Sequence, residues 1–217
     1  MGNDIEALQT VARAPLRTLR PQDLDHILTH PRRTLVRLTD NGALTRIAKG
    51  IYTAPPNGHD GRTWKPTLEA AGLAAGTARF GNRNAILMGI GAARHWAAIP
   101  RAIGVTTIAV PEAGRGPVDL DHGGTVHFIP RNLDRIDAVL ERTELGPALV
   151  ATPAQTLFDL AMKPMQGGMP DEAAAAIKNL LAVVTAKDLR KIMSRHTRAN
   201  ATLRAALDTL EREGRHG

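Results

Sequence analysis

The sequence predicts a two-domain α+β protein. The first observation is that residues 1–53 contain the patterns of helix, short strand, helix, helix and hairpin, a set complete without any later residue. The second is the proline- and glycine-rich stretch 54–61, which is typical of a linker. The third is a change beyond it to alternating helices and β-branched strands, with only helical patterns at the end. We therefore expect one domain at 1–54 and a mixed α/β domain at 66–217, helical from about 153.

The N-terminal elements follow from apolar spacing. Apolar residues in 5–12 recur at helical spacing, and Pro15 ends that helix. Residues 18–20 predict a short strand that pairs with the later hairpin. Pro21 begins a second helix, whose buried face consists of three apolar residues, Leu24, Ile27 and Leu28.

A short helix from Pro31 to Gly42 is the stretch on which the function depends. Proline suits a first helical position, and glycine suits the position just past the end. At about 100° per residue, Leu35 and Leu38 point into a core. The opposite arc is expected to hold His30, Arg33, Thr34, Arg37 and Asn41. Arg32 falls toward the buried side, so we expect it at the start of the helix, touching a phosphate at most.

A hairpin follows at once. Strands at 44–48 and 51–53 flank the tip Lys49-Gly50, and Arg46 and Lys49 make the hairpin basic. Tyr52 is expected to pack within the hairpin or core. A helix with an arginine face beside a basic hairpin is the winged helix-turn-helix arrangement. Such a helix enters the major groove, where arginine pairs with guanine and asparagine with adenine, while the hairpin contacts phosphates.

The composition limits the function classes. The chain has 217 residues and a net charge of +7. Residues 1–53 carry eight Lys/Arg against five Asp/Glu and residues 186–217 carry eight against four, whereas 54–185 carry twelve of each. Basic ends suggest a polyanionic partner. The absence of cysteine excludes disulfides and thiolate sites. Aromatic residues make up only 3% of the chain, which argues against a surface that stacks the bases of single-stranded nucleic acid. No stretch approaches membrane-span length, so we expect a cytoplasmic protein with no membrane partner.

The second region shows strands and helices in turn. Helices are expected at 66–78 and 90–99, and strands at 85–88, 105–110 and 125–129. Thr152 is expected to cap a helix that begins at Pro153. Further helices are expected at 171–183, 186–196 and 199–213. The last has a leucine stripe at Leu203, Leu207 and Leu210 with Arg204 and Arg212 outside.

Three segments together resemble the AbiEi-type antitoxin family of type IV toxin–antitoxin systems. The first is Gly42 to Tyr52, similar to the family pattern G-x-L-x-R-x…G-x-Y. The second runs from Ile86 to Pro111 and includes Gly89-Ile90-Gly91-Ala92-Ala93-Arg94-His95-Trp96. The third, Val150 to Ala161, is similar to V-T-x-x-x-x-T-L-x-D-L-A. The resemblance covers about residues 5–163 and tells least about the helical tail.

The resemblance implies a function. Such antitoxins bind inverted repeats in double-stranded DNA upstream of their own operon, repress it, and neutralise a nucleotidyltransferase-like toxin, generally without a stable complex. Carried over by position, the DNA-contacting set is Arg33, Thr34, Arg37, Asn41, Arg46 and Lys49, to which we add Arg32 as a phosphate contact at the start of the helix. We expect no enzymatic activity, no catalytic residues, no metal and no cofactor. The alternatives are a stand-alone winged-helix regulator, or a nucleotide-binding or enzymatic middle domain that the winged helix targets to DNA.

Two patterns favour that last alternative. Gly89-Ile90-Gly91 follows a strand, opens a helix and precedes Glu112 by about twenty residues, which is the outline of a dinucleotide fingerprint, but Arg94 occupies its third small position. Asp119-Leu120-Asp121-His122, with His127 nearby, could hold a divalent cation, yet flanking glycines favour a solvated loop. We expect a tight turn in the first case and a loop in the second.

Overall fold

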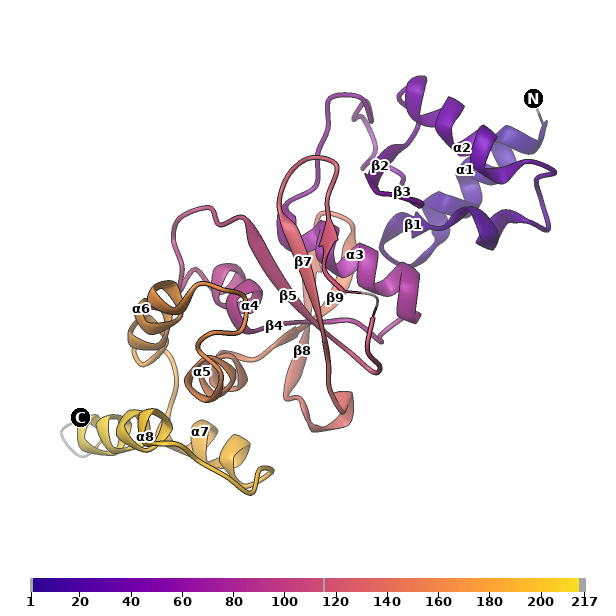
Figure 1. Ribbon diagram of the computed structural model, residues 1–217. Coiled ribbons are helices and arrows are strands. Elements are labelled where there is room, and N and C mark those ends of the chain that lie inside the picture. Colours follow the sequence, from indigo (N-terminus) through magenta and orange to yellow (C-terminus); the bar gives the residue numbers. More distant parts are fainter. Residues whose placement is uncertain (1, 115, 215–217) are drawn as a thin grey trace.

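The computed structural model describes residues 2–114 and 116–214. Within that part of the chain there are eight α-helices and two sheets, a mixed α+β fold. Figure 1 shows a small N-terminal part at one end, a twisted sheet in the centre, and the C-terminal helices at the other end. None of the described helices is long and apolar enough to span a membrane.

The N-terminal part contains the predicted elements with one change. Its elements are α1 (Gly2–Arg13), η1 (Pro15–Arg17), β1 (Thr18–Leu19), η2 (Pro21–Leu24), α2 (Pro31–Asp40), β2 (Thr45–Ala48) and β3 (Ile51–Thr53). The predicted pairing of the first strand with the hairpin is confirmed, because Thr18 pairs with Thr53. The helix expected from Pro21 is wrong: it is one 3-10 helix followed by turns, although Leu24 and Leu28 are buried as expected.

The central sheet has six strands in the order β6-β7-β5-β4-β9-β8. The elements of this region are α3 (Leu68–Phe80), β4 (Ile86–Met88), α4 (Gly89–His95), β5 (Val105–Val110), β6 (Val118–Asp119), β7 (Thr125–Pro130), η3 (Leu133–Arg135), β8 (Ala138–Thr143) and β9 (Gly146–Ala151). The predicted strands β4, β5 and β7 are confirmed. The hairpin of β8 and β9 was not predicted, because β8 is an edge strand whose Val139 and Leu140 are exposed beside charged residues.

The C-terminal end is helical, as predicted. Its helices are α5 (Pro153–Met162), α6 (Pro170–Leu180), α7 (Ala186–Met193) and α8 (Ala201–Glu213). The Thr152 hydroxyl caps α5 by accepting a hydrogen bond from the Gln155 amide at 3.3 Å. In α8, Leu203 and Leu210 are buried and Arg204 is exposed, so the predicted leucine stripe is confirmed.

The β2–β3 hairpin takes part in two hydrophobic cores. Tyr52 packs with α1, η2 and α2, which confirms its predicted packing role. Ile47 and Ile51 pack instead with α3 and the central sheet. The linker-like stretch is also bonded to this region, since the Gly61 amide donates to the Gly42 carbonyl at 2.8 Å. The position of the hairpin therefore depends on both parts of the chain.

Candidate nucleic-acid interface

Helix α2 is held by its apolar side and its C-terminal turn. Leu35 and Leu38 are 0% and 5% exposed, as the sequence predicts. Gly42 follows the helix with φ of 78°, a backbone conformation that glycine adopts without steric cost. A Cβ atom there would lie 2.2 Å from the Asp60 carboxylate, so the turn also needs glycine for space. The orientation of α2 is thereby fixed by its buried leucines and by its C-terminal turn.

The exposed face of α2 differs from the predicted one. It consists of Arg32, Arg33, Val36, Arg37, Asp40 and Asn41. The prediction that Arg32 lies on the buried side is wrong, and Thr34 is half-buried. Pro31, Leu35, Leu38 and Gly42 together set the buried direction, and Arg32 lies about 90° from its centre. A long arginine side chain in that flanking position reaches solvent.

Val36 was missed by the sequence reasoning. Its side chain is 45% exposed and lies one turn after Arg32 on the outer face of α2. An apolar side chain on a DNA-facing helix can contact the methyl group of thymine. The available signal was its position, because it stands next to Leu35 but outside the leucine stripe.

A groove separates the start of α2 from the β2–β3 hairpin. It has a volume of about 960 Å³ and is bordered on its third side by η2. Arg32 and Arg33 line it from the helix, and Arg46 and Lys49 line it from the hairpin. Four of the seven predicted residues therefore converge on one concave surface. Gln22 and Asp25 also line it and were not predicted. His30, which the sequence analysis placed on the outer arc but not among the DNA contacts, lines it too.

Thr34, Arg37 and Asn41 do not line the groove. Arg37 and Asn41 are exposed. The guanidinium of Arg37 donates to Asp4 of α1 at 2.7 Å, and the two side chains are 52% and 29% exposed. An exposed ion pair of this kind contributes only about 0–1 kcal/mol. Arg37 can exchange this partner for another anion at little cost.

Arg46 is tied to the central part of the chain. Its Nε donates to a carboxylate oxygen of Asp121, and this hydrogen bond is the largest cause of the raised pKa of Arg46. The Asp121 amide also donates to the Ile47 carbonyl at 2.8 Å. The loop after β6 therefore lies along the outer edge of β2 and sets the direction of one basic side chain.

The turn at Gly89–Gly91, which the nucleotide-site alternative requires to be open, is filled by neighbouring side chains. These residues are buried, and a Cβ on Gly91 would lie 2.3 Å from the Thr106 hydroxyl and 2.7 Å from Leu87. The glycines thus allow α4 to pack closely on the sheet, as expected for a tight turn. Glu112 is exposed.

The acidic loop also has structural partners. Asp119 accepts a hydrogen bond from the Thr125 hydroxyl at 2.8 Å, and Asp121 holds Arg46. Burial, followed by the charge of Lys65, lowers the pKa of His122. Over residues 2–114 and 116–214, no three acidic, histidine or cysteine side chains are grouped in a way that could hold a metal ion.

The fold is similar to that of a mycobacterial protein. The crystal structure of the RV2827C protein from Mycobacterium tuberculosis superposes with a TM-score of 0.62 and 20% sequence identity, over 99% of this chain and 78% of that one. No protein-family profile and no curated protein sequence matches the chain. At this level of identity, the similarity shows a shared fold.

Proposed function

We propose that the N-terminal part is a winged helix-turn-helix module that binds double-stranded DNA with sequence specificity. Helix α2 is the recognition helix and the β2–β3 hairpin is the wing. The observation that carries the proposal is the groove in which Arg32 and Arg33 of the helix face Arg46 and Lys49 of the hairpin. Two elements that converge on one groove with cations suit a DNA backbone between them.

The contacts divide by position on the two elements. Arg33 and Arg37 lie on the outer face of α2, where they read bases together with Asn41. Arg32, at the start of α2, and Lys49, at the tip of the hairpin, bind phosphates, and both line the groove together with Arg33. Arg46 already has a carboxylate partner, so it contributes less charge than the sequence suggests. Phosphate contacts supply most of the affinity and make it fall with salt.

We propose further that the protein is an AbiEi-type antitoxin that represses its own operon and neutralises a nucleotidyltransferase-like toxin. The support is the three-segment sequence resemblance together with a groove lined by basic side chains and joined to a mixed α+β part. A stand-alone regulator would share the groove but lack the toxin. Two observations distinguish these alternatives. An antitoxin is expected to have a nucleotidyltransferase reading frame beside its gene, and its expression is expected to rescue cells that express that toxin.

Fluorescence anisotropy tests the DNA proposal directly. The full-length protein is titrated into labelled duplex from upstream of its own gene and into a scrambled duplex, across a salt series. The proposal requires tighter binding to the upstream duplex and an affinity that falls linearly in log salt. Equal affinity for both duplexes would contradict sequence-specific binding.

Replacing Arg37 by alanine is expected to cost about 1–3 kcal/mol on the cognate site and less on scrambled DNA, because a base contact is lost. The matched variant is Asp4→Asn, which removes the present partner of Arg37. It is expected to strengthen cognate binding by up to about 1 kcal/mol. Equal losses on both duplexes for Arg37→Ala would show that Arg37 does not read bases.

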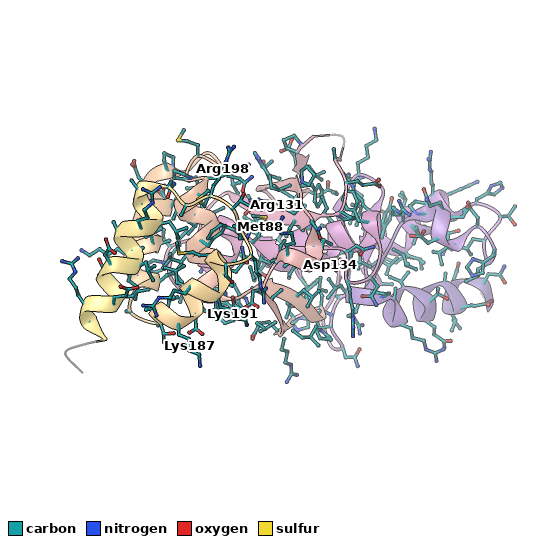
Figure 2. All side chains as sticks on the ribbon, turned by 90° about the horizontal axis from the view of Figure 1, so that it is seen from below. Met88, Arg131, Asp134, Lys187, Lys191 and Arg198 are labelled. Carbon is teal, nitrogen blue, oxygen red and sulfur yellow. The ribbon has the colours of Figure 1, made fainter. Side chains whose placement is uncertain are left out.

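Replacing Lys49 by glutamine is expected to weaken binding equally for all DNA sequences, because one phosphate contact is lost. The slope of log affinity against log salt concentration is expected to fall in magnitude by about one. Lys187→Gln removes the same charge from the exposed side of α7, at the other end of the molecule (Figures 1 and 2). That control is expected to leave both quantities unchanged. Similar effects in the two variants would mean that net charge, and not the wing, drives binding.

A further inference from the structure

A polar cavity lies far from α2, where the central sheet meets the C-terminal helices. Its volume is about 180 Å³. It is lined by Arg131, Asn132, Arg135, Ile136, Gln155, Asp159 and His196. These residues come from the end of β7, from η3 and its flanks, from α5, and from the segment after α7. Figure 2 shows Arg131 at this junction.

Two buried polar atoms in this cavity have no hydrogen-bond partner among the described residues. Asp159 is 5% exposed; its Oδ1 accepts from the Gln155 amide at 3.1 Å, while its Oδ2 is unpaired. The Nε2 of His196 is the second such atom, and its ring stacks on Phe158 at 4.3 Å. Buried polar atoms in folded proteins nearly always have a partner. Both atoms line the same cavity, so one small ligand can satisfy both.

The cavity also holds excess positive charge. Arg131 lies 3.9 Å from Asp159, too far for a hydrogen bond, so its donors are available to a ligand. The guanidinium of Arg135 donates to the backbone carbonyl of Arg195. The guanidinium of Arg195 forms an ion pair with Asp137 at 3.2 Å. Burial, followed by the charges of Arg135, Arg131 and Arg195, lowers the pKa of His196. Three guanidinium groups thus act on one point of the cavity.

The donors and acceptors define the chemistry of the ligand. Arg131 and Arg135 donate, and so does the side-chain amide of Asn132, because its oxygen already accepts from the Asp134 amide at 3.1 Å. The imidazole of His196 can donate through Nε2. The one group that must accept is Asp159 Oδ2. A fitting ligand therefore has several acceptor oxygens, a negative charge and one O–H donor.

We propose that this cavity binds a singly protonated phosphate group, as inorganic phosphate or a small phosphomonoester. Its oxygens accept from the arginines, Asn132 and His196, and its P–OH donates to Asp159. The volume equals that of roughly six waters, enough for a phosphate and its first ester carbon. Sulfate carries no proton near neutral pH and leaves a carboxylate facing an oxyanion. A carboxylate ligand has the same defect.

Binding should depend on pH in a defined direction. The complex keeps one proton between the phosphate and Asp159, and a phosphate ester loses its second proton near pH 6. Binding above that pH takes up one proton, so affinity is expected to fall by up to about tenfold per pH unit. The charged and titratable groups that face this proton are Arg131, Arg135, Lys163, Arg195 and His196.

The test is calorimetric titration of the full-length protein in chloride buffer at pH 6.5. Inorganic phosphate, sulfate, adenosine monophosphate and adenosine are compared at matched ionic strength. Phosphate is expected to bind about fourfold tighter than sulfate at this pH, because phosphate brings its own proton, whereas sulfate requires Asp159, with a pKa of about 6, to take up a proton first. Adenosine monophosphate that binds tighter than phosphate assigns an ester as the ligand, and equal binding assigns the free anion. Sulfate binding equal to phosphate overturns the proposal.

Three variants locate the site. Asp159→Asn offers sulfate an amide donor, so the preference for phosphate over sulfate is expected to disappear. Arg131→Gln is expected to weaken phosphate by at least about tenfold, because charge-assisted hydrogen bonds are lost. Arg142→Gln removes an exposed arginine from β8 and should change nothing. An equal loss in Arg142→Gln and Arg131→Gln contradicts the assignment. If Asp159→Asn fails to fold, the wild-type preference at pH 6.5 and pH 8 decides instead.

Discussion

Replacing Leu35 by alanine is expected to lower the free energy of unfolding by about 2–5 kcal/mol, because three buried carbon atoms are lost and a cavity is left. Leu35 is 0% exposed and packs in the core that α2 shares with α1, η2 and Tyr52. Urea unfolding followed by circular dichroism measures the change. The same variant is expected to lose the proposed DNA binding at temperatures at which the N-terminal part is unfolded.

Val36→Ala is the matched control for this prediction. Val36 is the next residue of the same helix but is 45% exposed, so its truncation should change stability by no more than about 0.5 kcal/mol. An equal loss in both variants would mean that Leu35 is not a core residue.

The shape of the Leu35→Ala unfolding curve also tests the predicted domain boundary. If residues 1–54 unfold independently, only one of two transitions should move. If the packing of Ile47 and Ile51 against α3 couples the two parts, a single transition should move as a whole.

Local signals explain which parts of the fold could be predicted. Proline at the start of α2, glycine after its end and two leucines at helical spacing are short-range features, and the structure places all of them as expected. The Thr152 cap and the hairpin tip at Gly50 are of the same kind. Each depends on contacts within a few residues, so the sequence pattern is sufficient.

Long-range partners explain what could not be predicted. Arg37 and Arg46 look equally available in the sequence, yet Asp4 and Asp121 hold them, and Asp121 is 75 residues from Arg46. The phosphate-sized cavity combines residues from Arg131 to His196, three separate segments that only the tertiary fold brings together. The exposure of Arg32 depends on which side of α2 faces the core. The apolar residues of the helix alone do not define that side narrowly enough to decide whether Arg32 is buried.

Wild-type stability is expected to fall as the pH rises from about 4 to about 7, because of Asp159. Burial is the largest cause of a pKa of about 6 for this carboxyl, against 3.8 for an ordinary aspartate, and it outweighs the opposing charge of Arg131. The folded state therefore binds a proton more tightly than the unfolded state between these values. The contribution of this proton to the free energy of unfolding is therefore fully present below pH 3.8, and it is lost as the pH rises through about 6 and Asp159 releases the proton. The difference corresponds to about 3 kcal/mol as an upper estimate.

Replacing Asp159 by asparagine is expected to remove this loss. The amide keeps an oxygen that accepts from Gln155 but carries no charge to bury. In phosphate-free buffer, the variant should match the wild type near pH 4 and exceed its stability by up to about 3 kcal/mol at pH 8. Asp208→Asn, on the exposed side of α8, is the control and should follow the wild type at every pH. If the variant is less stable than the wild type at pH 8, the attraction between Arg131 and the carboxylate outweighs the cost of burying the charge. Asp159 would then be a structural counter-ion for Arg131.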